Sequence, residues 1–188
     1  MDDASAESRW YLMLFPDEVE TEGLVSRLRA LAASAAGVAT TTPHVTIGYF
    51  QGAAIPEAVV RQLGLLAEPA IPIRATGLFS WSENAHPQFG YALSLHVDRS
   101  DALQRWQRAA RTALAPLALR PNFGWEAQEP HMHAIGHLAE PPAATIALLT
   151  DRAFPLTFTA TRLVVSQQVG VGFVTWLDRR LHNGACSD

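Results

Sequence analysis

Two short stretches of the sequence carry histidines at matching positions. Pro43-His44-Val45-Thr46-Ile47 lies in the first half of the chain, and Pro130-His131-Met132-His133-Ala134 lies in the second. Residues i and i+2 of a β-strand point to the same side, so we expect His44 to share a face with Thr46, and His131 with His133. Two imidazoles brought together can supply one proton acceptor and one proton donor near neutral pH. Such a pair suits acid–base chemistry on a phosphate ester.

Each of these residues also has an ordinary structural explanation. A strand histidine is often satisfied by a hydrogen bond in the core, and Thr46 also fits simple β propensity. The matching contexts of the two motifs favour catalysis by His44 and His131 and phosphate binding by Thr46. A His-x-His pair is also a common pair of metal ligands. We expect no metal, and a three-histidine site made by His44, His131 and His133 is the alternative.

The hydrophobic pattern predicts the elements that carry the motifs. Alternating or continuous apolar runs indicate strands, and a 3.6-residue period indicates helices. The first half reads strand, helix, histidine strand, helix, strand, and the second half repeats this order before a final hairpin strand. The predicted strands cover residues 10–15, 43–50, 71–81, 89–97, the second motif, 154–168 and 171–181, and the predicted helices begin near residues 24, 56, 100 and 142.

This repeated order predicts an α+β fold. We expect two duplicated lobes with mainly antiparallel sheets, related by a pseudo-two-fold axis around a central groove, with helices on the outside. The whole chain, residues 1–188, then forms one bilobal domain. Its first repeat covers about 10–82 and its second about 89–182, with polar tails at 1–8 and 183–188. We expect the ligand to bind in the groove between the lobes.

Composition narrows the classes of function. All 14 basic residues are arginine, which excludes chemistry that needs a lysine ammonium, such as Schiff-base formation. A formal net charge of −4 gives no broad positive field for duplex DNA or an anionic membrane. The single Cys186 excludes an intrachain disulfide and favours a reducing compartment. No signal peptide and no apolar run of roughly 18 residues is present, so we expect a cytoplasmic protein.

The paired motifs resemble those of the two-histidine phosphoesterase superfamily, which includes the 2',5' RNA ligase-like proteins and the cyclic nucleotide phosphodiesterases. Its members carry one His-x-Thr/Ser-apolar motif in each lobe of a bilobal fold and use no metal. Residues 44–47 match this motif fully, whereas His133 stands where Thr or Ser is usual. The resemblance implies that His44 and His131 are the general base and acid. It also implies that Thr46 hydrogen-bonds a non-bridging phosphate oxygen.

These inferences together predict a metal-independent phosphodiesterase that opens a cyclic phosphate or cleaves a 2',5' linkage on a nucleotide or RNA end. His133 would donate to the phosphate in place of a hydroxyl. Tyr49 and Trp125 are candidates for stacking on a nucleobase, although aromatic residues more often belong to the core. Arg74 and Arg162, on corresponding strands of the two halves, are further candidates for phosphate contacts.

We expect no cofactor, a monomeric chain, and a partner that is a nucleotide or RNA terminus carrying a phosphate. Because His133 breaks the motif of the superfamily, a second class of function stays open. The chain would then be a module that binds a nucleotide or an RNA end without turnover.

Overall fold

Strands and helices follow one another along the chain in the order that the hydrophobic pattern predicts. The computed structural model describes residues 8–52, 55–80, 90–117, 119–121, 130–138, 141–149, 155–169 and 172–182. In chain order the elements are β1 (Ser8–Pro16), α1 (Glu18–Ser34), β2 (Val38–Ala39), β3 (Val45–Gly52), α2 (Pro56–Gly64), β4 (Ile71–Phe79), β5 (Tyr91–Val97), α3 (Asp101–Leu114), the 3-10 helix η1 (Ala115–Leu117), β6 (Arg120–Pro121), β7 (His131–Leu138), α4 (Pro142–Leu149), β8 (Leu156–Val169) and β9 (Gly172–Arg180). The two-residue strands β2 and β6 were not expected from the sequence.

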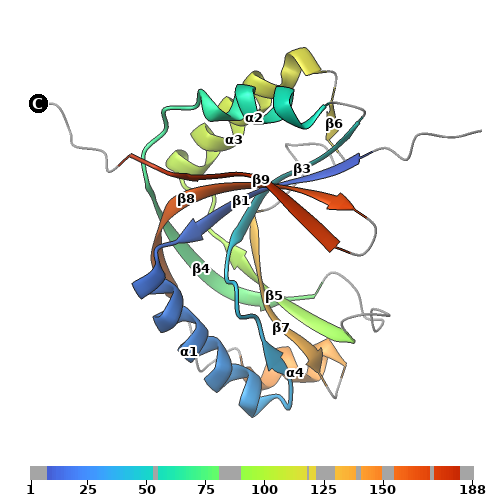
Figure 1. Ribbon diagram of the computed structural model, residues 1–188. Helices are drawn as coiled ribbons and strands as arrows, with labels where there is room; N and C mark the ends of the chain where they lie inside the picture. The colour runs from blue at the N-terminus through green and yellow to red at the C-terminus, as the bar shows by residue number, and fades with distance from the viewer. Residues whose placement is uncertain are drawn as a thin grey trace, which may run out of the picture.

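The named strands of the described ranges form one antiparallel sheet. Its order is β2-β7-β5-β4-β8-β1-β3-β6. The first part of the long strand β8 pairs with β4, and its remaining part pairs with β9. In addition β3 pairs with β7. The sheet therefore curls round until the two strands that carry the histidine motifs meet (Figure 1).

The strand order contains an internal two-fold relation. Strands β1, β3 and β4 take the places in the first half of the chain that β5, β7 and β8 take in the second. The order reads the same from either end once each of these strands is exchanged with its counterpart and β2 is exchanged with β6. One arm of the sheet is β2-β7-β5-β4 and the other is β8-β1-β3-β6, so each arm combines strands from both halves of the chain. The predicted repeats at about 10–82 and 89–182 therefore do not coincide with the two arms.

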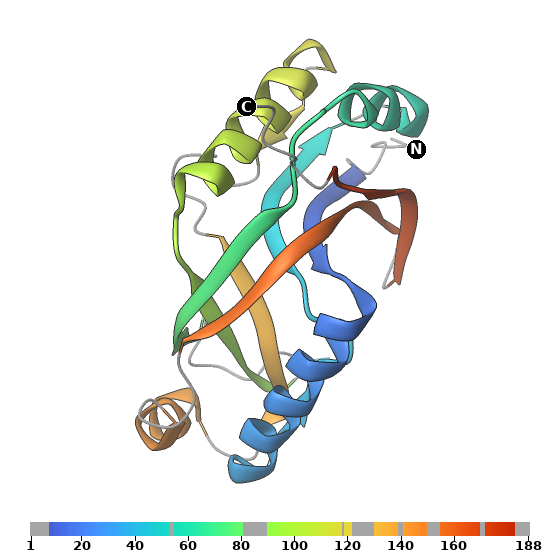
Figure 2. The same ribbon diagram turned by 90° about the vertical axis from the view of Figure 1, so that its left-hand side faces the viewer.

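Helices cover the outside of this sheet. Helix α1 contacts β2, β7 and β8, and α4 contacts β4 and β5, whereas α2 packs on α3 and β9, and α3 packs on β3. Figures 1 and 2 show α2 and α3 together at one end of the molecule and α1 and α4 at the other. The α+β class with a mainly antiparallel sheet and outer helices is thus confirmed. Among the described residues, none of the helices is long and apolar enough to cross a membrane.

Local chemistry explains where two of the helices begin. The carboxylate of Asp17 accepts a hydrogen bond from the Glu20 N–H at 2.8 Å, which caps α1. The hydroxyl of Ser100 accepts from the Leu103 N–H at 3.2 Å and caps α3. Between these helices and the sheet lies the core, in which the side chains of Trp10 and Trp106 are almost fully buried.

Strand β1 shows how the two faces of the sheet differ. Trp10, Leu12 and Leu14 are fully buried in the core, whereas the residues between them are only partly buried. Alternation of this kind places Met13 and Phe15 on the opposite face. This second face carries the histidine motifs, and we call it the histidine face.

Candidate active site

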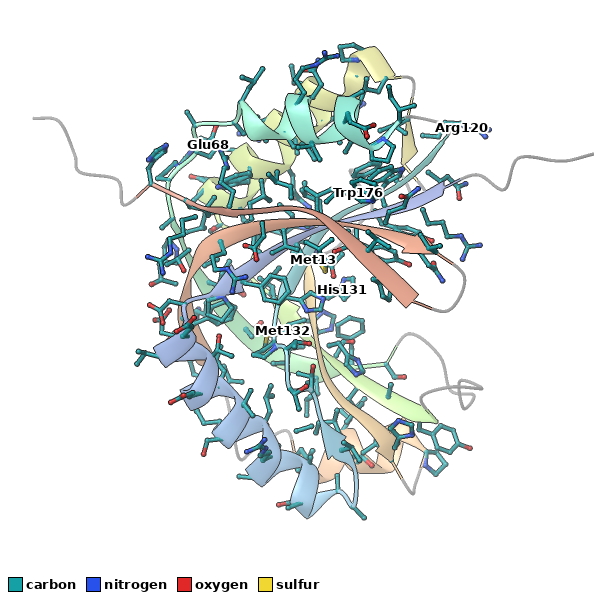
Figure 3. The ribbon with its side chains drawn as sticks, viewed as in Figure 1. Met13, Glu68, Arg120, His131, Met132 and Trp176 are labelled. Atoms are coloured by element: carbon teal, nitrogen blue, oxygen red, sulfur yellow. The ribbon has the colours of Figure 1, made fainter. Side chains whose placement is uncertain are left out.

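The two histidine motifs lie side by side where β3 pairs with β7. Thr46 is opposite His131 in this antiparallel pair. His44 lies two residues before Thr46, just outside β3, and is close enough to His133 to lower its pKa. Residues directly opposite share a face, and their Cβ atoms lie about 4.5 to 5.5 Å apart. The four side chains therefore gather where β3 pairs with β7, and Figure 3 shows His131 near the middle of the molecule.

A β-bulge occurs at the same place in each motif. The register of β1 against β3 skips Ile47, and the register of β5 against β7 skips Ala134. A bulge changes which residues share a face. As a result Tyr49 lies on the same face as Thr46, three residues away, although strict alternation would put them on opposite faces. The bulge thus extends the histidine face along β3.

The carbonyl groups at the two bulges are satisfied in different ways. The Gln107 side chain of α3 donates from Nε2 to the Ile47 carbonyl at 3.0 Å. The carbonyl of Ala134 accepts instead from the backbone N–H of Thr40 at 2.9 Å. The first bulge therefore depends on a side chain, and the second on the backbone that follows β2.

Its surroundings hold His44 in the neutral form. Its Nδ1 lies 2.8 Å from the Thr42 carbonyl, and because a carbonyl can only accept, Nδ1 carries the proton and Nε2 is left with its lone pair. Its ring stacks on Phe15 at a centroid distance of 5.0 Å. Burial lowers the pKa of His44, and the nearby His131 lowers it further, against an opposing effect of the Thr42 carbonyl.

His131 has more polar surroundings. His131 lies opposite His96 of β5. The corresponding neighbour of His44 in the first motif is the ring of Phe15. Phe79 stacks on His96 at a centroid distance of 4.1 Å and presents an edge contact to His131 at 6.4 Å. His96 was not singled out from the sequence, because a lone histidine in an apolar strand gains meaning only when the pairing of that strand is known.

His133 lies opposite Ser94 of β5. Burial lowers the pKa of His133, and the neighbouring His44 and His131 lower it further. Without a ligand the ring is therefore neutral near pH 7 and offers one N–H donor. The expectation that His133 acts as a charged donor then depends on an anionic ligand, which would raise its pKa again.

Thr46 and Tyr49 are both largely buried. Thr46 is 8 % exposed, and within the described part of the chain its hydroxyl has no hydrogen-bond partner. Tyr49 is 9 % exposed, and its ring packs against Tyr11 of β1 at a centroid distance of 4.7 Å. The Thr46 hydroxyl is thus available to a ligand beside His131, whereas Tyr49 offers little of its ring face.

Comparison with known proteins assigns the family. The family model of the 2'-5' RNA ligase superfamily matches residues 15–172. The chain belongs to the 2'-5' RNA ligase superfamily. This confirms the resemblance drawn from the two motifs. No curated protein sequence matches this superfamily member.

Solved structures share the fold of this superfamily member at low sequence identity. TT0787 of Thermus thermophilus is 15 % identical with a TM-score of 0.62, over 94 % of this chain and 99 % of that chain. E. coli LigT complexed with 3'-AMP is 12 % identical with a TM-score of 0.60, over 94 % and 99 % of the two chains. A structure described as a phosphoesterase is 12 % identical with a TM-score of 0.61, over 94 % and 99 %.

The two arginines expected to contact phosphate are engaged by carboxylates in this superfamily member. Arg74 forms an ion pair with Asp98 at 3.2 Å. Arg162 lies over the Phe15 ring, 5.8 Å from its centroid, and hydrogen-bonds Asp178 from Nε at 3.1 Å and also from Nη2. Both guanidinium groups therefore already have anionic partners, which argues against the expected phosphate contacts. Trp125, the other candidate outside the motifs, lies outside the described residues.

A metal site also lacks support in this superfamily member. Among the described residues, no group of three or more His, Cys, Asp or Glu side chains is arranged to hold a metal ion. This holds for His44, His131 and His133, although their strands are paired. The alternative of a three-histidine metal site is therefore not favoured by the geometry.

Proposed function

We propose that the protein is a metal-independent phosphodiesterase that opens a cyclic phosphate, or cleaves a 2',5' phosphodiester, on a nucleotide or RNA end. The observation that carries this proposal is the pairing of β3 with β7, with Thr46 opposite His131. It brings the two motifs together, so that His44, Thr46, His131 and His133 lie near one another. Membership of the 2'-5' RNA ligase superfamily supports the same class of reaction.

The two protons of the reaction divide between His44 and His131. Nε2 of His44 takes a proton from water while the water oxygen forms a bond to phosphorus. His131 gives a proton to the ribose oxygen as its bond to phosphorus breaks, and the products are a ribose hydroxyl and a phosphate monoester. An in-line displacement puts the attacking and leaving oxygens on opposite sides of phosphorus, and we propose that His44 serves the first and His131 the second.

The charge that develops on the phosphate is met by two donors. The hydroxyl of Thr46 can donate to one non-bridging oxygen, and the N–H of His133 can donate to the other. An anion held there raises the pKa of His133, so part of the protein would carry a charged donor at acidic pH. Thr46 and His133 are thus our candidates for substrate binding, with Tyr49 behind them and Trp125 in the segment before β7.

The ligand is proposed to be a nucleotide or RNA terminus that carries a phosphate. Solved structures of E. coli LigT contain 3'-AMP, phosphate, ATP and NADP+. We further propose a monomer without a cofactor in the cytoplasm. The single cysteine, which favours a reducing compartment, supports this location.

Turnover of 2',3'-cyclic nucleotides and 2',5'-linked dinucleotides in excess chelator tests the proposal. We expect hydrolysis that chelator does not reduce. Binding of these ligands without turnover would support a binding module, to which the departure at His133 points. Activity that appears only with added zinc or manganese would overturn the metal-independent mechanism.

A further inference from the structure

Aromatic rings extend the histidine face toward the β8–β9 hairpin. Phe173 of β9 is 59 % exposed, and its ring makes an edge contact with Tyr11 of β1 at a centroid distance of 5.1 Å. Tyr11 is half-buried and in turn packs on the buried Tyr49. We call the rings of Phe173 and Tyr11, with Tyr49 behind them, the aromatic shelf.

The register of the strands puts the aromatic shelf on the histidine face. Tyr11 is opposite Tyr49, which the bulge brings onto the same face as Thr46. Phe173 is opposite Gln168 of β8, whose side-chain oxygen accepts from the Tyr11 hydroxyl at 3.3 Å. Tyr49, where the shelf begins, lies roughly 10 Å from Thr46 along β3. Phe173, where it ends, lies three strand spacings from β3, which is roughly 14 Å across the sheet.

Positive charge borders the outer end of the shelf. Arg9 is exposed and lies two residues before Tyr11, so it shares the face of the shelf. Gln51 of β3 pairs with Arg9 on one side and with Arg120 of β6 on the other. Figure 3 shows Arg120 at the end of β6, away from His131. A chain of phosphates that leaves the histidines along β3 therefore meets two arginines.

The shelf itself is uncharged. Burial raises the pKa of Tyr11 well above its ordinary range, and the hydroxyl of Tyr49 raises it further. The phenol therefore stays neutral near physiological pH and does not repel a phosphodiester. Phe173 is the exposed ring of the shelf, and an exposed aromatic ring beside arginines is a usual combination in sites for single-stranded nucleic acid.

We propose that the aromatic shelf stacks bases of a single-stranded RNA whose terminal phosphate lies at the histidines. This inference rests on the proposed function and narrows its substrate class to an oligonucleotide end. A mononucleotide held at Thr46 and His131 is too short to reach Phe173, so the shelf adds affinity for the longer ligand alone.

The opposite face of β9 supplies a matched control. Val174 is 42 % exposed and pairs with Gln167, on the other side of the hairpin from Phe173. Trp176 also lies on that side, where its Nε1 donates to the Gln167 side chain at 2.9 Å, and Figure 3 shows it on the side of β9 toward α2. Truncating Val174 removes an exposed apolar side chain from the same hairpin, as truncating Phe173 does, but leaves the rings of the shelf in place.

Binding of a short single-stranded RNA with a 3'-phosphate, measured by fluorescence anisotropy, tests the inference without requiring turnover. Phe173→Ala should weaken this binding about tenfold, since a stacked aromatic ring contributes on that order. It should leave binding of 3'-AMP unchanged. Val174→Ala should change neither, and Phe173→Trp should retain the affinity for RNA.

Three results would overturn the shelf. The first is an equal effect of Phe173→Ala on the binding of RNA and of 3'-AMP, and the second is no effect on either. The third is an altered oligomeric state of Phe173→Ala in analytical ultracentrifugation with unchanged RNA affinity, which would make the hairpin a protein interface. A protein that binds RNA through Phe173 but hydrolyses no substrate would contradict the proposed function and leave the shelf intact.

Discussion

The two histidine motifs share a β-bulge at the matching position and have different neighbours. His44 stacks on Phe15, whereas His131 lies opposite His96. Thr46 lies opposite Met13, whereas His133 lies opposite Ser94. One motif thus faces apolar side chains of β1 and the other faces polar side chains of β5.

This difference suits the opposite roles that we propose for the two histidines. Two imidazoles in identical surroundings would titrate alike, and neither would be set apart as base or acid. Burial disfavours the charged form of His44, which fits the role of proton acceptor that we propose for it. We propose that His131, which lies opposite His96 of β5, serves as the donor.

The largest effect should come from removing either of the two histidines that we propose as base and acid. His44→Ala and His131→Ala should each lower kcat/KM on the order of 10²-fold or more, because each removes one proton transfer. His182→Ala changes an exposed histidine after β9 and serves as the control. Steady-state kinetics with folded variants measures this, and near-normal rates for both alanine variants would contradict the division into base and acid.

The bulges should differ in their sensitivity to side-chain changes. Gln107→Leu leaves the Ile47 carbonyl without its donor and should lower the free energy of unfolding by about 1 to 3 kcal/mol. Gln104→Leu removes a similar bond from the same helix to the exposed Arg99 carbonyl and should have a smaller effect. Urea denaturation compares the two, and equal midpoints would show that the first bulge does not need α3.

His133→Thr makes the second motif like the first. The hydroxyl keeps one hydrogen bond to the phosphate, so activity should persist, but the charge of a protonated ring is lost. The charged form is present below the pKa of His133 and disappears as the pH rises through it. Burial lowers that pKa and a bound anion raises it again, so the penalty of about 1 to 2 kcal/mol in transition-state stabilisation should be largest at acidic pH and fade as the pH rises.

A pH profile of kcat/KM for His133→Thr gives the answer. A constant loss at every pH would mean that His133 acts without charge. A profile equal to that of the unaltered protein would place His133 outside the reaction.

The smallest effect should come from making the surroundings of His44 polar. Phe15→Asn relieves part of the desolvation that lowers the pKa of His44, so that pKa should rise. A base with a higher pKa is protonated over more of the acidic range. The acidic limb of kcat/KM should therefore move to higher pH by a fraction of a unit, with little change in the plateau. Phe15→Leu keeps the site apolar and should leave the limb in place, so equal shifts in both variants would refute this cause.

Much of the fold follows from local sequence pattern. The apolar run at residues 10–15, the alternation at 89–97 and the helical stripes of α1 and α3 depend on neighbours within a few residues, and the described strands and helices match them. The cap at Ser100 is local in the same sense. The shared face of His131 and His133 also follows from the two-residue period of a strand.

Other features depend on which strands pair, and no local pattern contains that information. The exchange of strands between the two halves, the place of His96 beside His131, and the bulges at Ile47 and Ala134 all arise when distant segments come together in one sheet. Register is set by side-chain packing and hydrogen bonds across strands, and a shift of one residue would turn every side chain to the other face.

The sequence by itself determined the two motifs, the chemistry open to their side chains and the order of the elements, because these depend on residue type and short-range periodicity. Only the tertiary structure decided that Thr46 meets His131, that burial keeps His44 neutral, and that Phe173 of the last strand continues the same face. The physical reason is that contact and burial are properties of the closed sheet, in which residues far apart in the chain exclude water from one another.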